Sequence, residues 1–411
     1  MRPYTLVGPS LAVALTVAIS VYCLGTTWAQ DNRARSNRGY VETDLVVNKS
    51  VNGVPTLTDK NGIVHIAKFF DPNLQNPWGI GESGGSPFWV SDNASGQASL
   101  YNTQGAPQSL VVSIPAPGDP LHASGAPTGN VFNIANAQGA FKISGFTKGG
   151  IATTAPALFL FATEDGTIVG WNPAVNPEGF DPTKAGTYGI IAIDHSAIPT
   201  PTNGAVYKGL AIATDEHGAT FLFATNFRAG TVEVYGADFK PVVSPGAFTD
   251  SKLPAFYVPF DIVPITINGK IELFVTYAVQ NAAKHDDVAG QGHGIVDTFD
   301  LTGQMRMRFA QHDQLNSPWG VALTPPDFGE LGGSLWIGNF GNGQINAFDP
   351  NSGKFISKVR QSNAQPIVID GLWAIRFGNG GNGGALDTLY FTAGTNGETD
   401  GLFGSLTPNE H

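Results

Sequence analysis

Short apolar runs recur along the chain, and a polar turn and a second apolar run follow most of them. The first runs of these pairs lie at 88–90, 158–161, 221–223, 273–275, 335–337 and 389–391. They recur about every 60 residues and are rich in Phe, Trp, Leu and Val, residues that favour strands. This regular spacing of short strands predicts a repeat protein whose units share one architecture.

The second runs indicate antiparallel partners for the first. They lie at 167–172, 231–235, 295–300 and 345–349, and apolar and polar positions alternate along them. Such alternation is typical of half-buried antiparallel strands. No stretch of ten or more residues holds the 3.6-residue period of a helix, so an all-β fold is expected.

A motif marks the start of the repeat. Asn-Pro-Trp-Gly-Ile at 76–80 returns as Ser-Pro-Trp-Gly-Val at 317–321. Repeats that cannot bury both faces alone must stack on their neighbours. We therefore predict a six-bladed β-propeller of four-stranded antiparallel blades in one domain, residues 40–411. The last repeat lacks an outermost strand, which residues 41–47 are expected to supply, so that this N-terminal strand closes the ring.

Composition and charge restrict the partners and the compartment. The formal net charge is −11 and no run of Lys or Arg occurs, which argues against nucleic-acid binding. Arg2 and the apolar stretch 11–24, with cleavage after Ala29, predict a signal peptide over 1–29 and a flexible leader over 30–39. An uncleaved membrane anchor is the alternative. We expect the protein to be a secreted or periplasmic monomer. No disulfide is expected, because Cys23 is the only cysteine.

Five segments carry a family resemblance. They lie at 76–80, 162–168, 226–232, 315–320 and 369–380. Together they resemble an uncharacterised family of secreted bacterial propeller proteins that often end in a PEP-CTERM sorting tail. The resemblance implies NHL-like blades and export, and it implies no established reaction. The chain departs from the family at 406–411, which contains no Pro-Glu-Pro motif.

Propeller geometry predicts where a site would lie, because the loop entering the first strand of each blade and the hairpin between its second and third strands open on one face. The entry loops are expected to bring these residues to that face: Trp78, Lys208, Phe260, Trp319, Asp370 and Trp373. The hairpins are expected to bring the following residues to the same face: Asp92, Asn93, Glu164, Asp165, Asn226, Arg228, His285, Asp286, Asp287, Asn339, Asn342, Glu398 and Asp400. We predict that this face carries a mouth of carboxylates, amides and aromatic rings.

Two functions fit such a mouth. The first is a binding or scaffold protein for an extracellular polysaccharide, small molecule or protein. Its candidate ligand-binding residues are Trp78, Asp92, Asp165, Lys208, Arg228, Trp319 and Trp373. The alternative is a calcium-dependent hydrolase of esters or lactones, because oxygen ligands suit Ca²⁺ and a bound cation polarises a carbonyl. Its candidate ligands are Glu164, Asn226, Asn339 and Asp370, with His285 or Asp286 as the base.

Structural explanations compete with both functions. Asp and Asn are common at hairpin turns because they tolerate left-handed backbone geometry. The tryptophans follow repeat positions, so packing between blades explains them as well. The long loop 281–293 contains His285 and His293, which with Asp286 and Asp287 could form a transition-metal site. The alternative is that the segment is a solvated loop. The other histidines, His65 among them, are scattered and indicate no site.

Overall fold

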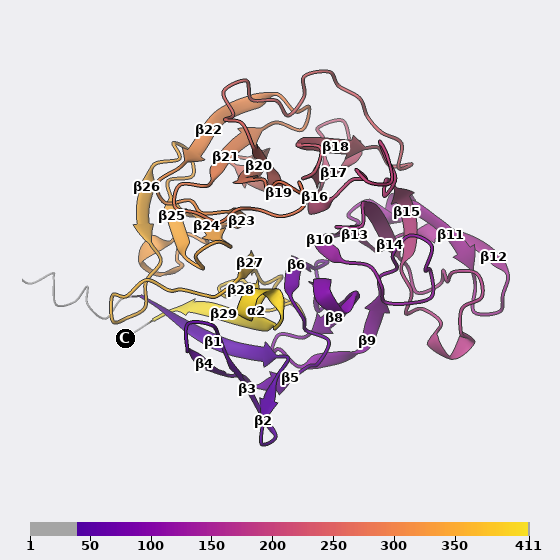
Figure 1. Ribbon diagram of the computed structural model, residues 1–411, viewed down its shortest axis with the longest axis horizontal. Coiled ribbons are helices and arrows are strands. Elements are labelled where there is room, and N and C mark those ends of the chain that lie inside the picture. The colour runs from indigo at the N-terminus through magenta and orange to yellow at the C-terminus, as the bar shows by residue number, and fades with distance from the viewer. Residues whose placement is uncertain (1–38, 410–411) are drawn as a thin grey trace, which may run out of the picture.

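The computed structural model describes residues 39–409 (Figure 1). The predicted signal peptide over 1–29, and all of the predicted leader except its last residue, lie outside this range. Figure 1 shows twisted sheets arranged around a common centre. The predicted all-β propeller is therefore the observed fold. Within 39–409, no helix is long and apolar enough to cross a membrane.

Six sheets, taken in chain order, form the ring. The first contains β6 (Pro77–Gly81), β7 (Phe88–Asp92), β8 (Gln97–Tyr101) and β9 (Pro107–Ser113). The second contains β10 (Pro127–Phe132), β13 (Phe159–Thr163), β14 (Thr167–Trp171) and β15 (Ile190–Asp194), and the third β16 (Tyr207–Thr214), β17 (Thr220–Asn226) and β18 (Thr231–Tyr235). The fourth contains β19 (Tyr257–Ile267), β20 (Lys270–Val279), β21 (Ile295–Phe299) and β22 (Met305–Gln311), and the fifth β23 (Pro318–Leu323), β24 (Leu335–Asn339), β25 (Ile345–Phe348) and β26 (Phe355–Lys358).

The sixth sheet combines strands from both ends of the described chain. It has the order β27 (Leu372–Phe377), β28 (Leu389–Ala393), β29 (Leu402–Pro408), β1 (Tyr40–Val47) and β5 (Phe69–Phe70). Strand β1 pairs antiparallel with β29 along its whole length, from Tyr40 opposite Pro408 to Val47 opposite Leu402. The predicted pairing of residues 41–47 with the last repeat is observed.

Smaller elements decorate the ring. One small sheet contains β2 (Ser50–Val51), β3 (Val54–Thr58) and β4 (Val64–Ile66), and another contains β11 (Lys142–Phe146) and β12 (Ala152–Pro156). The helical turns are η2 (Asn93–Ser95), η3 (Asn136–Gln138), η4 (Pro182–Lys184), η5 (Gly329–Leu331) and α2 (Thr395–Glu398). The second small sheet projects outward from the ring (Figure 1).

The repeated motif has a structural cause at the centre. Each innermost strand contacts the next around the ring, in the order β6, β10, β16, β19, β23 and β27, and β27 returns to β6. In all six, the pairing register with the second strand shifts at the same place, between Pro77/Ile80, Pro127/Asn130, Tyr207/Leu210, Pro259/Ile262, Pro318/Val321 and Leu372/Ile375. Glycine is needed here because a Cβ on Gly79 would lie 2.6 Å from the Thr128 carbonyl oxygen.

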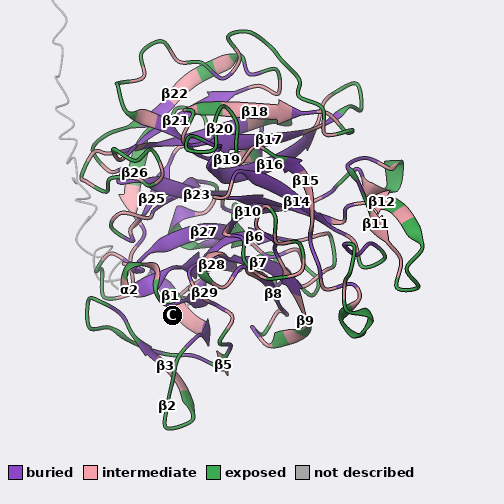
Figure 2. Ribbon diagram, turned by 45° about the vertical axis from the view of Figure 1, so that its right-hand side comes forward, coloured by how far each residue is buried: buried purple, intermediate pink, exposed green. Residues whose placement is uncertain are grey.

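The predicted half-buried character of the third strands is wrong for most of them. Every residue of β14, β21 and β25 is buried, and only β18 is largely intermediate or exposed. Each sheet lies between two neighbouring sheets, so both of its faces are covered. Figure 2 shows this burial running through the central strands, while exposed residues lie in the outer loops and in β11 and β12. Some buried polar groups of these strands find partners inside the protein, as where the Asn346 amide donates to the Gln314 carbonyl.

Candidate functional site

Polar side chains from distant segments meet where the innermost strands begin. Glu164 follows β13, Lys208 lies in β16, and His285 and Asp286 lie in the loop after β20. The Lys208 ammonium pairs with the Glu164 carboxylate and lies 3.6 Å from Asp286 Oδ1. His285 Nδ1 lies 3.9 Å from Glu164 Oε1. We call these four residues the mouth cluster, and they lie on the face where the sequence predicted a mouth.

Lys208 occupies a special position in the ring. It lies within the register shift of β16, at the place that Trp78, Trp319 and Trp373 hold in β6, β23 and β27. Its side chain is only 2% exposed, and its ammonium lies 4.8 Å from the centre of the Trp78 ring. Burial of an ammonium is costly without an opposite charge. Glu164 supplies that charge, so the pair is the electrostatic centre of the mouth.

The rim of the mouth carries a histidine and aspartate pair. His285 Nδ1 and Asp286 Oδ1 are 2.7 Å apart. This hydrogen bond, and secondarily the charge of Lys208, lowers the pKa of Asp286 to about 2. Asp286 is therefore ionised at any physiological pH, and its side chain is 60% exposed. It offers an accessible negative charge beside the buried ion pair.

Further carboxyl groups surround this centre. Burial raises the pKa values of Glu398, Asp287 and Asp165 above their ordinary range. Glu398 Oε2 accepts a 2.8 Å hydrogen bond from the Asn76 amide, and Asn93 donates to Glu164 at 2.9 Å. These side chains therefore give the mouth more hydrogen-bond acceptors than donors. Their carboxyl groups also outnumber Lys208, the one lysine of the mouth cluster.

The three tryptophans close the centre beneath this mouth. Trp78 and Trp373 stack with ring centres 3.5 Å apart, and Trp319 lies edge-on to both at 6.1 and 5.8 Å. Phe340 stacks on the other face of Trp373 at 4.0 Å. All three tryptophans are at most 4% exposed. Packing therefore explains their repeat positions, and none presents a free ring to a ligand.

The other predicted ligand-binding residues have partners of their own. Asp92 is completely buried and accepts a hydrogen bond from the Ser99 backbone. Arg228 donates to the Gly204 carbonyl at 2.8 Å, and Asp165 accepts from the Ala126 backbone at 2.7 Å. Of the predicted ligand-binding set, only Lys208 belongs to the mouth cluster.

The structure does not bring the four predicted calcium ligands together. Asn226 donates to Glu233 at 2.7 Å, and Asn339 donates to the Gln314 carbonyl at 2.8 Å. Asp370 forms an ion pair with Lys60 at 2.6 Å. Only Glu164 lies in the mouth cluster, where Lys208 already supplies a positive charge. Asn226 bonds within its own hairpin, a role that asparagine commonly has, whereas Asn339 and Asp370 bond to more distant segments.

A cavity of about 390 Å³ lies beyond the tryptophans, toward the opposite ends of the innermost strands. Aliphatic residues of all six innermost strands line most of it, and Arg376 and Glu82 lie at its edge as an ion pair of 2.8 Å. Asp261 stands in this cavity at a position where β6, β10, β16 and β23 have glycine. Burial raises the pKa of Asp261 to about 7.

Asp261 is expected to make folding stability depend on pH. The folded protein holds this proton up to about pH 7, whereas the unfolded chain releases it near pH 4, so stability falls as pH rises between these values. Asp261→Asn should therefore stabilise the protein at pH 8 by on the order of 2 kcal/mol and have little effect near pH 4. Thermal unfolding at both pH values measures this difference. An equal change at both would contradict the assignment.

Two parts of the polar architecture were not predicted from the sequence. Asn76 was seen only as part of a repeat motif, yet it bonds Glu398 and accepts from the Trp373 indole nitrogen at 3.0 Å. His65 was treated as carrying no signal, yet it forms a group with Glu42 and Asp44. The spacing of these residues along the sequence does not indicate the group, because its members come from separate strands, β1 and β4.

The chain is similar to several known proteins. No family model matches the chain. Two uncharacterised proteins of Acanthamoeba polyphaga mimivirus are 28% and 29% identical, covering 83% and 84% of this chain and 76% and 83% of their own lengths. Similar solved structures include a streptogramin B lyase (15% identity, TM-score 0.44, covering 91% of this chain and 99% of that one) and a glucose dehydrogenase (13% identity, TM-score 0.45, covering 81% and 96%).

These comparisons leave the finer family assignment open. The sequence relatives named above are viral. They do not support a bacterial family with a PEP-CTERM tail, so that assignment stays a prediction. The chemistry of the solved structures is theirs alone, because likeness at this level of identity concerns only the fold.

Proposed function

We propose that this protein is an exported binding or scaffold protein that recognises an extracellular ligand at the mouth cluster. The observation that carries the proposal is the buried Lys208–Glu164 pair with the exposed Asp286 beside it. The tryptophans fill the centre below, so a ligand would rest on the rim and not pass through the ring. Export itself rests on the signal peptide predicted over residues 1–29.

The chemistry of the rim favours a protein segment with basic side chains over a polysaccharide. Asp286 and Glu164 are acceptors, and Asp287, Glu398 and Asp165 add further carboxyl groups. Lysine and arginine side chains donate to such groups with charge assistance. A polysaccharide usually needs an exposed aromatic ring for stacking, and the tryptophans of the mouth are buried.

Binding of two probes tests this proposal. A hexalysine peptide should bind the untagged protein, and Asp286→Asn or Glu398→Gln should weaken binding about tenfold through loss of rim charge. Glu216→Gln is the matched control, because Glu216 is 88% exposed and its ion-pair partner is the neighbouring His217, outside the mouth. Titration calorimetry at low and high salt measures the affinities. Equal weakening by the control, or binding of dextran instead of the peptide, would refute a basic-segment site.

A calcium-dependent hydrolase of esters or lactones is the second candidate. The observation that favours it is the His285–Asp286 hydrogen bond, since a carboxylate that orients a histidine is a common arrangement for a general base. The Lys208 ammonium weighs against it, because it lies where a cation would meet Glu164. If Ca²⁺ raises the melting temperature, EDTA reverses the rise and Glu164→Gln abolishes it, hydrolysis becomes the better function.

A further inference from the structure

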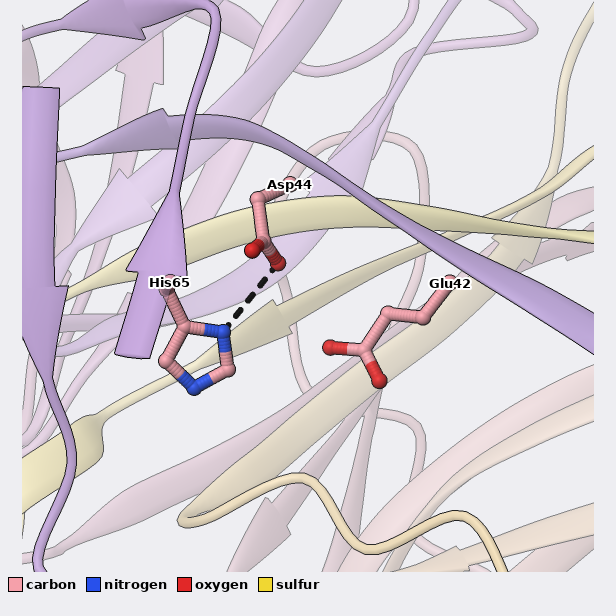
Figure 3. A group of neighbouring side chains, drawn as sticks. All are labelled: Glu42, Asp44 and His65. Atoms are coloured by element: carbon pink, nitrogen blue, oxygen red, sulfur yellow. Dashed lines mark hydrogen bonds and ion pairs between the residues drawn. The ribbon is translucent and has the colours of Figure 1, made fainter. Parts of the chain in front are cut away.

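A second polar group lies at the junction where the ring closes. Glu42 and Asp44 are two residues apart in β1, so their side chains share one face of that strand. His65 lies in β4 of the small sheet next to it. Figure 3 shows the carboxyl groups of Glu42 and Asp44 and the imidazole of His65 turned toward one another. One ligand atom from each lies within 4.8 Å of the others.

The imidazole of His65 lies between two carboxylates. Its Nδ1 is 3.2 Å from Asp44 Oδ1, and its Nε2 is 3.8 Å from Asp59 Oδ2. His65 is 4% exposed, and its Nε2 has no hydrogen-bond partner. A neutral imidazole carries one N–H, so either tautomer directs a lone pair at a carboxylate. A proton or a metal ion on the ring satisfies both sides.

The surroundings supply no other cation. Among residues 39–409, no salt bridge joins Glu42, Asp44 or Asp59 to a lysine or an arginine. Asp59 is held in place by the backbone amides of Asn61 and Ile63, at 2.9 and 2.8 Å.

We propose that Glu42, Asp44 and His65 bind one divalent transition-metal ion of the zinc class. An imidazole with two carboxylates is a donor set for such ions, and Ca²⁺ prefers six to eight oxygen ligands. Zinc lies about 2 Å from each ligand atom, so the three side chains need to draw together by less than about 1 Å. With the metal on Nδ1, the Nε2–H would point at Asp59, the usual second carboxylate behind a metal-bound histidine.

The ion would fasten the closing strand to its neighbour. Glu42 and Asp44 belong to β1, which pairs with β29, whereas His65 and Asp59 belong to the β3–β4 hairpin. Asp44 is 17% exposed at its side chain, which leaves a route for the ion from solvent. The site is separate from the mouth cluster, so it does not depend on the function proposed there.

Zinc titration of the untagged, metal-free protein tests the site. One Zn²⁺ should bind and raise the melting temperature by about 3–6 °C at a hundredfold excess over the dissociation constant. Co²⁺ should give the visible absorption of a four-coordinate site, and Ca²⁺ should not compete. Glu42→Gln and Asp44→Asn should each weaken zinc binding at least tenfold. Glu42→Gln should fold well without metal, because it removes a repelling carboxylate.

Variants of the other acidic group serve as controls. Glu164, His285 and Asp286 also lie within 4.8 Å of one another, so Glu164→Gln and Asp286→Asn are matched to the two test variants. Both should retain the zinc-dependent shift. No zinc binding by the wild type would overturn the proposal, and the imidazole would then carry a proton only. Zinc binding that survives Glu42→Gln, or that is lost in Glu164→Gln, would also overturn it.

Discussion

A chain that lacks residues 40–48 is expected to lose cooperative thermal unfolding. These residues include β1, which covers the edge of β29 and buries Tyr40, Leu45, Val46 and Val47. The Tyr40 hydroxyl also donates to the Phe328 carbonyl at 2.9 Å, which ties β1 to the preceding sheet. Removal would leave a sheet edge unpaired and the ring open. Differential scanning calorimetry measures the transition.

The control for this deletion is a chain that starts at residue 39. It keeps β1 entire, so it and the longer chain should each unfold in one sharp transition. If deletion of residues 40–48 leaves the melting transition unchanged, β1 does not close the ring.

Trp373→Ala is expected to destabilise the protein by about 4 kcal/mol, the usual cost of truncating a fully buried tryptophan. Trp373 stacks between Trp78 and Phe340, and its indole nitrogen donates to Asn76. The truncation removes both stacks and leaves an unfilled space in the axis of the ring. Denaturant unfolding followed by circular dichroism measures the loss.

Trp373→Phe separates packing from ligand contact. It retains one aromatic ring and loses the hydrogen bond to Asn76 and part of the stacking area, so it should cost less than Trp373→Ala, about 1–2 kcal/mol. If Trp373→Ala left stability unchanged and abolished binding of the peptide instead, Trp373 would be a ligand platform and the packing assignment would be wrong.

Much of the fold was predictable because backbone geometry leaves a pattern in the sequence. Pro77-Trp78-Gly79 and its repeat at 318–320 mark the start of inner strands, where neighbouring backbones approach too closely for a Cβ. The pairing of residues 41–47 followed from the missing strand of the last repeat. The burial of the third strands was misjudged, because alternation of residue types cannot show that both faces of a sheet are covered.

The site was only partly predictable, because side-chain partners depend on contacts between distant segments. The shared face of the entry loops and hairpins placed Glu164, Lys208, His285 and Asp286 correctly on one mouth. The sequence could not show that Lys208 would occupy the cation position beside Glu164, nor that Asn226, Asn339 and Asp370 would each bond a partner outside the mouth cluster. The His65 group depends on the docking of β4 against β1, which no local pattern records.

The ring joins Lys208 and Glu164 in a buried ion pair that organises the mouth. A double-mutant cycle of Glu164→Gln and Lys208→Met, measured by denaturant unfolding, tests it most directly. We predict a coupling free energy of about 2 kcal/mol, because each single variant leaves the other charged group buried and unpaired. A coupling below about 0.5 kcal/mol would mean that the two side chains act independently, and the mouth described here would not exist.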